Sequence, residues 1–385
     1  MNTETLSAMI SCQRHLFDIP EDIAYFNCAY LSPLLKSVKE AGYIGIDRKH
    51  RPWKLQPSHF FDESEQARQL FAGLMGAAAG DIAIIPSVSY GIAVAAASLK
   101  INAGDEIVLL HEQFPSNVYP WREVARNRDA RIVTVQRAAG EDWCTAILGS
   151  ITERTRLVAI PNVHWTDGSL VDLPKVAKTC HEIGAHLVLD ITQSLGALPF
   201  SINEVRPDFL ICAGYKWLLG PYSIGFMYVS PKFQDCQPGE HNWLNRKHSE
   251  DFSGLVSYQD AFQPGARRFD VGERSNFILM PMMVAALQQI HAWTVPEIHA
   301  TLSNLTGKLA EQAAELGLSL SPVEQRAGHI LGLRFTRGLP HGILQKLSDR
   351  NVFVSVRGDA IRVAPHLYNN EQDLQRLIQV LAEVL

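Results

Sequence analysis

Between about residues 80 and 230, the sequence alternates short β-rich apolar runs with stretches whose apolar residues recur at helical spacing. Continuous apolar runs of this length are typical of strands buried on both faces, and helices between them are typical of crossover connections. The runs are residues 81–86, 106–111, 131–135, 156–162, 186–190, 208–213 and 223–229. The pattern predicts an α/β fold with a mostly parallel, seven-stranded open sheet.

The pattern changes after residue 280. Residues 281–317 have helical character with a break at Pro296, and shorter strand-like runs follow at 329–335, 352–357 and 360–364 before the amphipathic stretch 371–385. Short strands mixed with helices indicate a smaller α+β unit at the end of the chain.

A chain of 385 residues is long for a single hydrophobic core, which favours two domains. We expect a large domain at residues 20–285 and a small domain at residues 286–385. Residues 1–19 are expected to pack on the small domain. The polar stretch 235–275 is expected to be a long loop near the functional site or near a partner subunit.

Composition narrows the class of partner. Hydrophobic residues make up 46% and charged residues 19% of the chain, and the formal net charge is -5, which gives no basic surface for nucleic acid. The six cysteines are scattered without a Cys-x-x-Cys pair, so neither a disulfide framework nor a metal site is expected. No apolar run approaches the roughly 20 residues that span a bilayer. We expect a cytoplasmic protein that acts on a small molecule.

Ligands of open α/β sheets bind at the carboxyl ends of the strands, so polar residues after each run are candidates. Ser87-Val88-Ser89 separates the first run from a helical stretch and could bind an anion through backbone N–H groups or simply cap the helix. Phe114 follows the second run, where its ring could face a flat ligand or join the core.

Two further strand ends carry polar residues. Asn162 follows the fourth run and could be a satisfied turn residue, while His164 is better explained as structural than as catalytic. Asp190 ends the fifth run, with Gln193 three positions later. A carboxylate at the end of a buried strand is costly unless a cation or hydrogen-bond donor meets it, which makes Asp190 informative.

A lysine follows the sixth run, in the sequence AGYKWLLGPY at residues 213–222. An isolated lysine at a strand end is usually solvated, but a desolvated lysine has the lowered pKa that Schiff-base chemistry needs. Pyridoxal 5′-phosphate (PLP) requires a lysine, an acid that protonates its pyridine nitrogen, and a phosphate cradle. Lys216, Asp190 and the Ser87–Ser89 turn together favour this cofactor.

These residues carry a resemblance to a known family. The segment LVLDITQSLGALPFSINEVRPDFLICAGYKWLLGPYSIGFMYVS, residues 187–230, is its most specific block, and the similarity extends from YFNCAYLSP at 25–33 to the C-terminal helix. The chain resembles the class V aminotransferases, fold-type I PLP enzymes that include cysteine desulfurases, kynureninases and isopenicillin N epimerase-like proteins.

The resemblance implies a role for each candidate residue around the cofactor. Lys216 would form the internal aldimine and move the Cα proton, and Asp190 would pair with the pyridinium nitrogen. Further cofactor contacts are implied for Ser87, Val88, Ser89 and Tyr215 at the phosphate, Phe114 on the ring, Gln193 at the phenolic oxygen, and Asn162 beside that oxygen or the substrate.

The resemblance also implies how the substrate is held. Arg362, in AIRVAPHLYN, matches the family arginine that receives the α-carboxylate of an amino acid, a task that suits its planar fork of donors. The loop FNCAYLSP, which contains Asn27, would contribute to the substrate pocket. Family members build their sites across a two-fold axis, so a homodimer is implied.

Several positions depart from the family pattern. No cysteine lies near Arg362, and the nearest preceding one is Cys236, which argues against a persulfide-forming desulfurase. Gln193 stands where kynureninases usually carry histidine. Glu273 stands where many members have a threonine that reaches the partner's phosphate, although Arg274, Ser275 or Asn276 could substitute. Ala213 and Gly214 lack a hydroxyl that many relatives have before the lysine.

We therefore expect an enzyme that acts at Cα of an amino acid, as an aminotransferase, an epimerase or a lyase. A kynureninase-like hydrolase is the alternative within the family. Outside it, a non-catalytic α/β ligand-binding protein or a dehydrogenase would fit the fold. The glycine-rich stretch at residues 73–80 has the wrong spacing for a dinucleotide fingerprint, and the sequence contains no G-x-S-x-G elbow.

Overall fold

A seven-stranded sheet forms the centre of the computed structural model, which describes residues 9–138 and 140–385. The strand order is β2-β8-β7-β6-β5-β3-β4. The strands are β2 (Ile82–Ile85), β3 (Glu106–Leu110), β4 (Arg131–Val135), β5 (Thr155–Pro161), β6 (His186–Asp190), β7 (Phe209–Ala213) and β8 (Gly225–Val229). Strand β8 runs opposite in direction to the other six strands of this sheet. The predicted mostly parallel α/β sheet is confirmed, and each predicted run overlaps one of its strands, with β5 beginning one residue before its run.

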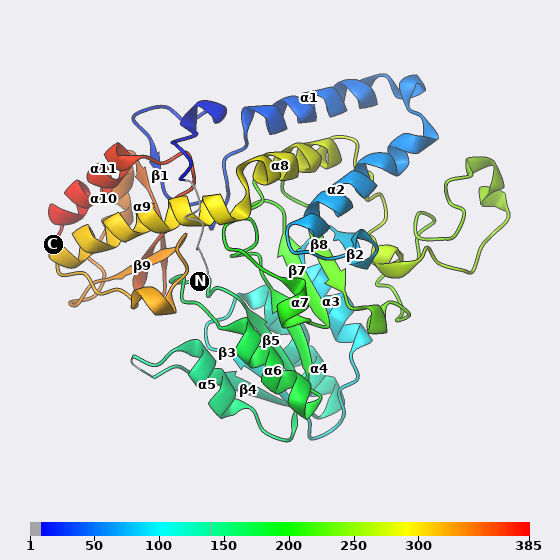
Figure 1. Ribbon diagram of the computed structural model, residues 1–385, viewed down its shortest axis with the longest axis horizontal. Helices are drawn as coiled ribbons and strands as arrows, with labels where there is room; N and C mark the ends of the chain where they lie inside the picture. The colour runs from blue at the N-terminus through cyan, green and yellow to red at the C-terminus, as the bar shows by residue number, and fades with distance from the viewer. Residues whose placement is uncertain (1–8, 139) are drawn as a thin grey trace, which may run out of the picture.

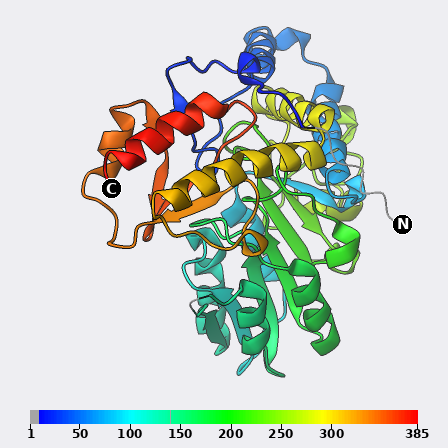
Figure 2. The same ribbon diagram turned by 60° about the vertical axis from the view of Figure 1, so that its left-hand side comes forward.

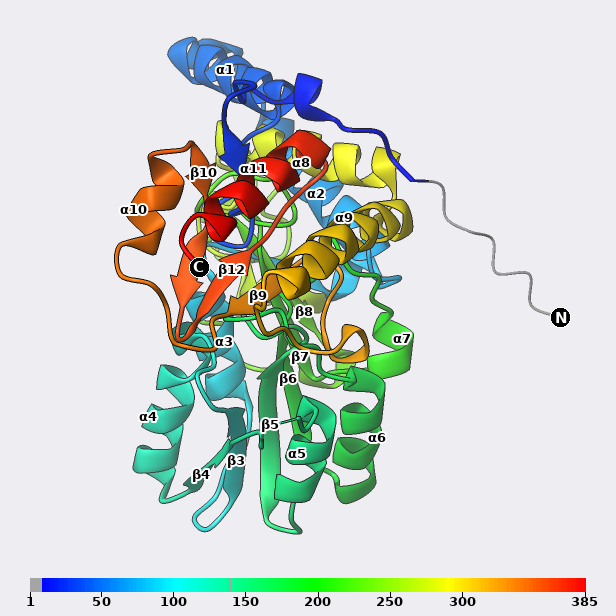
Figure 3. The same cartoon turned by 90° about the vertical axis from the view of Figure 1, so that its left-hand side faces the viewer.

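Helices cover both faces of this sheet (Figure 3). One face packs against α3 (Val88–Ser98) and α4 (Tyr119–Arg128) through one hydrophobic cluster. The other face packs against a larger cluster. The helices that contribute to it are α1 (Lys36–His50), α2 (Asp62–Gly73), α5 (Trp143–Ser150), α6 (Leu173–Ile183), α7 (Ile202–Val205) and α8 (Leu279–Trp293). Burial on both faces explains why these strands lack alternation in the sequence.

The C-terminal part of the chain gathers beside the sheet, as the orange to red segments of Figures 1 and 2 show. An antiparallel sheet of order β11-β12-β9 forms its centre. Its elements are β9 (Leu331–Arg334), β10 (Val352–Phe353), β11 (Ser355–Arg357), β12 (Ala360–Val363), α10 (Ile343–Ser348) and α11 (Glu371–Ala382). The α+β character expected after residue 280 is observed.

Helix α9 (Val295–Glu315) joins the two parts of the molecule. It begins after Thr294, whose backbone has φ +62° and whose side chain accepts a hydrogen bond from Glu297, so the helical stretch is interrupted beside Pro296 as expected. Ile298 and Leu302 pack into the core of the large sheet, whereas Leu309, Ala310 and Ala313 pack into the C-terminal core. A single helix therefore contributes to both cores.

The N-terminal strand β1 (Ala24–Tyr25) pairs in parallel with β10, and Ala24 and Phe26 belong to the C-terminal core. The domain boundaries remain a prediction. This pairing leads us to propose that the N-terminal segment associated with the small domain extends to about residue 27 rather than ending at residue 19. Residues 1–8 of the predicted segment lie outside the described residues.

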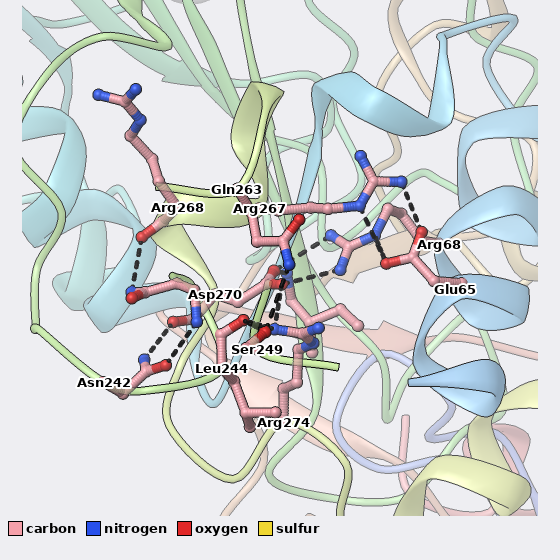
Figure 4. Close-up of polar contacts among 12 residues, drawn as sticks. Glu65, Arg68, Asn242, Leu244, Ser249, Gln263, Arg267, Arg268, Asp270 and Arg274 are labelled. Atoms are coloured by element: carbon pink, nitrogen blue, oxygen red, sulfur yellow. Dashed lines mark hydrogen bonds and ion pairs between the residues drawn. The ribbon is translucent and has the colours of Figure 1, made fainter. Parts of the chain in front are cut away.

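A buried ion cluster anchors the end of the 235–275 segment to strand β2 (Figure 4). Arg68 and Asp270 are fully buried and pair at 2.8 Å, and Asp270 Oδ1 also accepts the backbone N–H of Ile84 at 2.7 Å. Arg274 approaches the same carboxylate at 3.2 Å, and Arg267 pairs with Glu65 at 2.5 Å. Part of the 235–275 loop extends away from the rest of the molecule in Figure 1.

Within the described ranges, no helix combines the length and the apolar character that crossing a bilayer requires.

Candidate active site

A cavity of about 240 Å³ lies at the carboxyl ends of the central strands. Strand β2 is antiparallel to β8, which is antiparallel to β7, so β2, β5, β6 and β7 all end on this edge. The cavity is lined by eight of the residues predicted from the sequence: Ser87, Val88, Ser89, Phe114, Asp190, Gln193, Tyr215 and Lys216. Segments more than 100 positions apart in the chain thus converge.

The lysine sits in a closed loop after β7. The backbone N–H of Gly220 donates to the carbonyl of Gly214 at 2.9 Å, and that of Leu219 donates to the carbonyl of Lys216 at 3.0 Å. Leu219 is fully buried in the left-handed region at φ +55°, a conformation that the surrounding packing must impose on a leucine. A Cβ atom on Gly214 would lie 2.8 Å from the carbonyl oxygen of Ile224, so a hydroxyl-bearing residue does not fit there.

Lys216 is a buried amine without a partner. Its side-chain nitrogen lies 5.3 Å from the ring centre of Phe114 and 5.6 Å from that of Tyr215. It forms no hydrogen bond or ion pair with any residue in the described ranges. The pKa of Lys216 is lowered to about 8, mainly by burial; Asp190 opposes this shift and Arg362 adds to it. The neutral, nucleophilic fraction of this amine near neutral pH is therefore far larger than that of an ordinary lysine.

Asp190 is the matching buried carboxylate, 7% exposed at the end of β6. One of its oxygens accepts the backbone N–H of Thr192 at 3.0 Å, and the Thr192 side chain also hydrogen-bonds to it. Burial raises the pKa of Asp190, and no cation in the described chain pairs with it within 4 Å. The site therefore holds an uncompensated acid that a cationic ring nitrogen would satisfy.

The Ser87–Ser89 turn places the N-terminus of α3 at the cavity. Ser87 caps this helix by accepting the backbone N–H of Tyr90 at 3.2 Å, and its hydroxyl lies 3.0 Å from that of Ser89. Ser87 thus caps the helix, as one of the two interpretations of this turn predicted. The cap does not exclude anion binding at this turn, because the first backbone N–H groups of any helix lack intrahelical partners and face its N-terminal end.

Gln193 and Tyr215 border the cavity on the lysine side. The Gln193 side-chain oxygen accepts the indole N–H of Trp217 at 3.0 Å, and its amide donates to the carbonyl of Ala29 at 3.0 Å. One N–H of this amide remains for a ligand. Burial raises the pKa of Tyr215 to about 12, so its hydroxyl is a hydrogen-bond donor at physiological pH.

Asn162 does not reach this cavity. Pro161 and Val163 line it, whereas Asn162 lines a separate hollow that also includes Asp172. Successive residues of an extended chain point to opposite sides, so Asn162 points away when its neighbours point in. The expectation that it lies beside the ring is therefore corrected. His164 is buried and bonds to Thr166 and to the carbonyl of His111, in agreement with a structural role.

Arg362 reaches the site from strand β12 of the C-terminal sheet. Its Nη1 donates to the carbonyl of Trp165 at 2.7 Å, while Nε and Nη2 are buried without a partner. Burial lowers the pKa of Arg362 to about 9. Buried guanidinium nitrogens without acceptors are costly, and a carboxylate could satisfy both.

Asn27 lies next to this arginine in the structure. Its side-chain oxygen accepts the hydroxyl of Ser355 at 2.6 Å, and Ser355 is the residue opposite Arg362 in the β11–β12 pair. Neither Asn27 nor Arg362 lines the cavity itself. They belong to its surroundings on the side of the C-terminal sheet.

Among the lining residues that sequence reasoning missed, Thr192 and Trp165 make contacts that bear on the site. Thr192 lines the cavity, and its hydroxyl accepts the backbone N–H of Ala213 at 3.1 Å, which ties the Asp190 strand end to the Lys216 loop. Trp165 also lines the cavity and carries the carbonyl that Arg362 contacts. Thr192 could have been predicted from its place between Asp190 and Gln193, whereas no feature of the sequence indicated Trp165.

Three residues could substitute for the missing threonine, and they differ in whether their side chains are free to bind a phosphate. Arg274 is committed to Asp270 and to the carbonyl of Leu244 at 3.2 Å. The Asn276 side chain accepts the backbone N–H groups of Ile278 and Leu279 at the start of α8. Ser275 is the candidate whose hydroxyl has no hydrogen bond within the described residues. Those residues also contain no cluster of three or more His, Cys, Asp or Glu side chains that could hold a metal ion.

A profile of the family described as Aminotransferase class-V matches residues 48–377. The chain belongs to the class-V aminotransferase family. This confirms the family that the motif around Lys216 predicted, and with it an enzyme of a PLP-dependent family. The exact reaction is left open by the match.

The relatives of this class-V enzyme have different activities. It is 27% identical over 358 residues to the uncharacterized aminotransferase YcbU of Bacillus subtilis, covering 92% of this chain and 91% of that protein. It is 25% identical to a probable cysteine desulfurase of Methanothermobacter thermautotrophicus, covering 83% of each. It is 24% identical to the kynureninase of Bacillus anthracis, covering 92% and 84%.

Solved structures confirm the fold. The apo cysteine desulfurase of Thermococcus onnurineus superposes with a TM-score of 0.84 at 20% identity, covering 98% of both chains. A lysine-to-alanine mutant of C-DES, with glycine covalently linked to its PLP cofactor, superposes with a TM-score of 0.87 at 20% identity, covering 97% of this chain and 100% of that one. At these identities the likeness concerns the fold alone.

Proposed function

We propose that this chain binds PLP and acts at Cα of an amino-acid substrate, as an aminotransferase, an epimerase or a lyase. The observation that carries the proposal is that Lys216 and Asp190 line one cavity. The first is a buried amine without a partner, and the second is a buried carboxylate without a cation. PLP supplies an aldehyde that the amine can bind and an electron-withdrawing ring that stabilises negative charge at Cα.

The residues of the cavity fit the parts of this cofactor. Asp190 would hold a proton on the pyridine nitrogen, and the ring of Phe114 would lie against the pyridine face. Gln193 would donate its remaining N–H to the phenolic oxygen. The hydroxyls of Ser87, Ser89 and Tyr215, together with the backbone N–H groups at Val88 and Ser89, would surround the phosphate.

The same proposal gives the substrate two contacts. Arg362 would receive the α-carboxylate with the two nitrogens that are buried without acceptors, with Asn27 alongside. Once the substrate occupies the cofactor, the released Lys216 amine would take the proton from Cα. A neutral amine is required for that transfer, and the lowered pKa of Lys216 supports it.

A kynureninase-like hydrolase is the second candidate, and the kynureninase relative that covers 92% of this chain favours it. A cysteine desulfurase is disfavoured, because a mobile nucleophilic cysteine is required. Cys28 lies 3.8 Å from the carbonyl of Lys216, but it is fully buried and burial raises the pKa of its thiol. A buried neutral thiol is a poor nucleophile.

A panel of amino acids separates these reactions. The holoenzyme should be incubated with each amino acid, with and without a keto-acid acceptor, while keto acid, ammonia, sulfide, anthranilate and loss of optical activity are measured. An aminotransferase yields keto acid only with an acceptor, an epimerase changes optical rotation alone, and a lyase releases a substituent. The control is Lys216→Ala, which should abolish turnover. Sustained turnover by that variant would contradict the proposal.

A cytoplasmic homodimer completes the proposal. The six cysteines are free in the structure, which supports a reducing compartment. Helix α1 exposes Tyr43, Ile44 and Ile46, each about half accessible, which supports an interface with a second copy. Ser275 is then the residue we would assign to the partner's phosphate.

A further inference from the structure

A second arginine, Arg357, lies on the same face of the β11–β12 hairpin as Arg362. Ser355 pairs with Arg362 across the two strands, and Arg357 is two positions after Ser355 on the same strand. Because side chains alternate between faces, Ser355, Arg357 and Arg362 share one face. Diagonal neighbours in such a pair are about 7–8 Å apart at Cα, within reach of long side chains.

Trp165 connects both arginines to the cavity. Its backbone carbonyl accepts Nη1 of Arg362 at 2.7 Å, and the guanidinium carbon of Arg357 lies 5.3 Å from the centre of its indole ring. Trp165 itself lines the cavity that contains Lys216. Arg357 and Arg362 both lower the pKa of Lys216, so both charges act on the lysine's environment.

The charge of Arg357 is not balanced within the described residues. It forms no ion pair there, its Nε is buried without a partner, and its Nη1 donates only to the carbonyl of Val356 at 2.7 Å. Two acids lie near this hairpin: Asp359 in its turn, which is exposed and pairs with Arg334 at 3.1 Å, and Glu112, whose carboxylate oxygen would lie 3.7 Å from a Cβ built on Gly358. Glu112 is exposed and does not pair with Arg357.

Arg362 suffices for the α-carboxylate of a substrate, and Asp190 is reserved for the ring nitrogen. That leaves one cation beside the cavity without an anion. We propose that Arg357 receives a second anionic group, carried on the side chain of the substrate, and that the enzyme therefore prefers dicarboxylic amino acids. This inference rests on the proposed function and narrows its substrate class.

Arg357 could instead serve only to hold the indole of Trp165 by a cation–π contact. The two roles differ in what they do to selectivity. A role confined to supporting Trp165 would weaken every substrate alike when Arg357 is removed. A side-chain receptor would affect acidic substrates far more than neutral ones of the same length.

The test uses the PLP-loaded enzyme and amino acids that bind without losing a Cα proton. The probes are 2-methylglutamate, 2-methylaspartate and the neutral 2-methylnorvaline, with dissociation constants measured by calorimetry. The variants are Arg357→Gln and Arg357→Lys, with Glu112→Gln as the matched control. Thermal unfolding of each variant verifies that it is folded.

We expect the unmodified enzyme to bind at least one acidic probe about tenfold or more tightly than the neutral one, as a charge-assisted contact implies. Arg357→Gln should bring the ratio to within about twofold, Arg357→Lys should retain part of it because the charge remains, and Glu112→Gln should preserve or increase it. The acidic probe that binds more tightly shows which distance between the two carboxylates of a substrate the site prefers.

Equal binding of acidic and neutral probes by the unmodified enzyme, or a preference that survives in Arg357→Gln, would overturn the inference while leaving PLP chemistry intact. A chain that takes up no PLP would instead overturn the proposed function, and this inference with it. The two failures are therefore distinguishable.

Discussion

The reactivity of Lys216 depends on two opposing neighbours. Burial is the main cause of its lowered pKa, Arg362 adds to that effect, and Asp190 counteracts it. The loop from Gly214 to Gly220, whose backbone is closed by hydrogen bonds at Leu219 and Gly220, holds the lysine in a buried position. Its position in the fold thus lets the amine lose its proton at a lower pH than an ordinary lysine does.

This balance predicts a specific pH dependence in the cofactor-free protein. Acetylation of Lys216 by acetic anhydride, followed by peptide mass spectrometry, should rise with pH around a midpoint near 8, the value that burial imposes. Only the deprotonated amine reacts, so the rate is low below this pH and levels off above it. Arg362→Gln should move the midpoint upward, and Asp190→Asn should move it downward. A midpoint near the ordinary lysine value of 10.5 in all three proteins would contradict the assignment.

Much of the site was predictable residue by residue because charged groups at the ends of buried strands are rare. Lys216 and Asp190 stood out for that reason. The position of Asn162 was not predictable in the same way. Strand β5 is buried along most of both faces, so its sequence does not show which residues point toward the cavity. The contact between Trp165 and Arg357 was not predictable either, because it joins a residue just after β5 to the C-terminal sheet.

At the scale of elements, the ion cluster around Asp270 links β2, the strand that ends at the Ser87–Ser89 turn, to the polar 235–275 segment. Asp270 meets Arg68, Arg274 and the backbone of Ile84 in a region without solvent. Removing one charge from such a cluster leaves the others unpaired in a medium of low dielectric constant.

Asp270→Asn should therefore lower the free energy of unfolding by about 3–5 kcal/mol, the range for breaking a buried ion pair from one side. The matched control is Arg350→Gln, because Arg350 and Glu383 form an exposed pair, and exposed pairs contribute less than about 1 kcal/mol. Urea unfolding followed by tryptophan fluorescence compares the two. Similar losses in both variants would show that the cluster around Asp270 has no special role in stability.

The large sheet was predictable as a set of elements because each strand is an apolar run between helices. The two-residue strands β1 and β10 were not, since their sequences contain no periodic signal and their pairing joins residues more than 300 positions apart. The path of the 235–275 segment could not be predicted from the sequence either. Its end is fixed by contacts of Asp270 with Arg68 in α2 and with the backbone of Ile84 in β2.

At the scale of the whole molecule, the active site is assembled from two bodies. The large sheet provides Lys216 and Asp190, while the C-terminal sheet provides Arg357 and Arg362. Helix α9 packs into both cores, which fixes the position of one relative to the other. In the proposed function, substrate contacts and cofactor contacts therefore come from different parts of the fold.

The proposed homodimer gives a prediction at this scale. Light scattering coupled to size-exclusion chromatography should give twice the mass of one 42.8 kDa chain. Ile44→Glu, which places a charge on the exposed apolar side of α1, should shift the population toward monomer, whereas Lys178→Glu on the exposed side of α6 should not. A monomeric unmodified protein at micromolar concentration would contradict the dimer.

The central claim is that Lys216 holds the cofactor, and one measurement tests it most directly. The protein is purified with PLP, reduced with borohydride, digested and mapped by mass spectrometry. The account predicts a visible absorbance band that disappears on reduction and a stable pyridoxyl-phosphate adduct on the peptide that contains Lys216. It also predicts neither band nor adduct in Lys216→Ala. A protein that binds no PLP, or an adduct found mainly on another lysine, would contradict it.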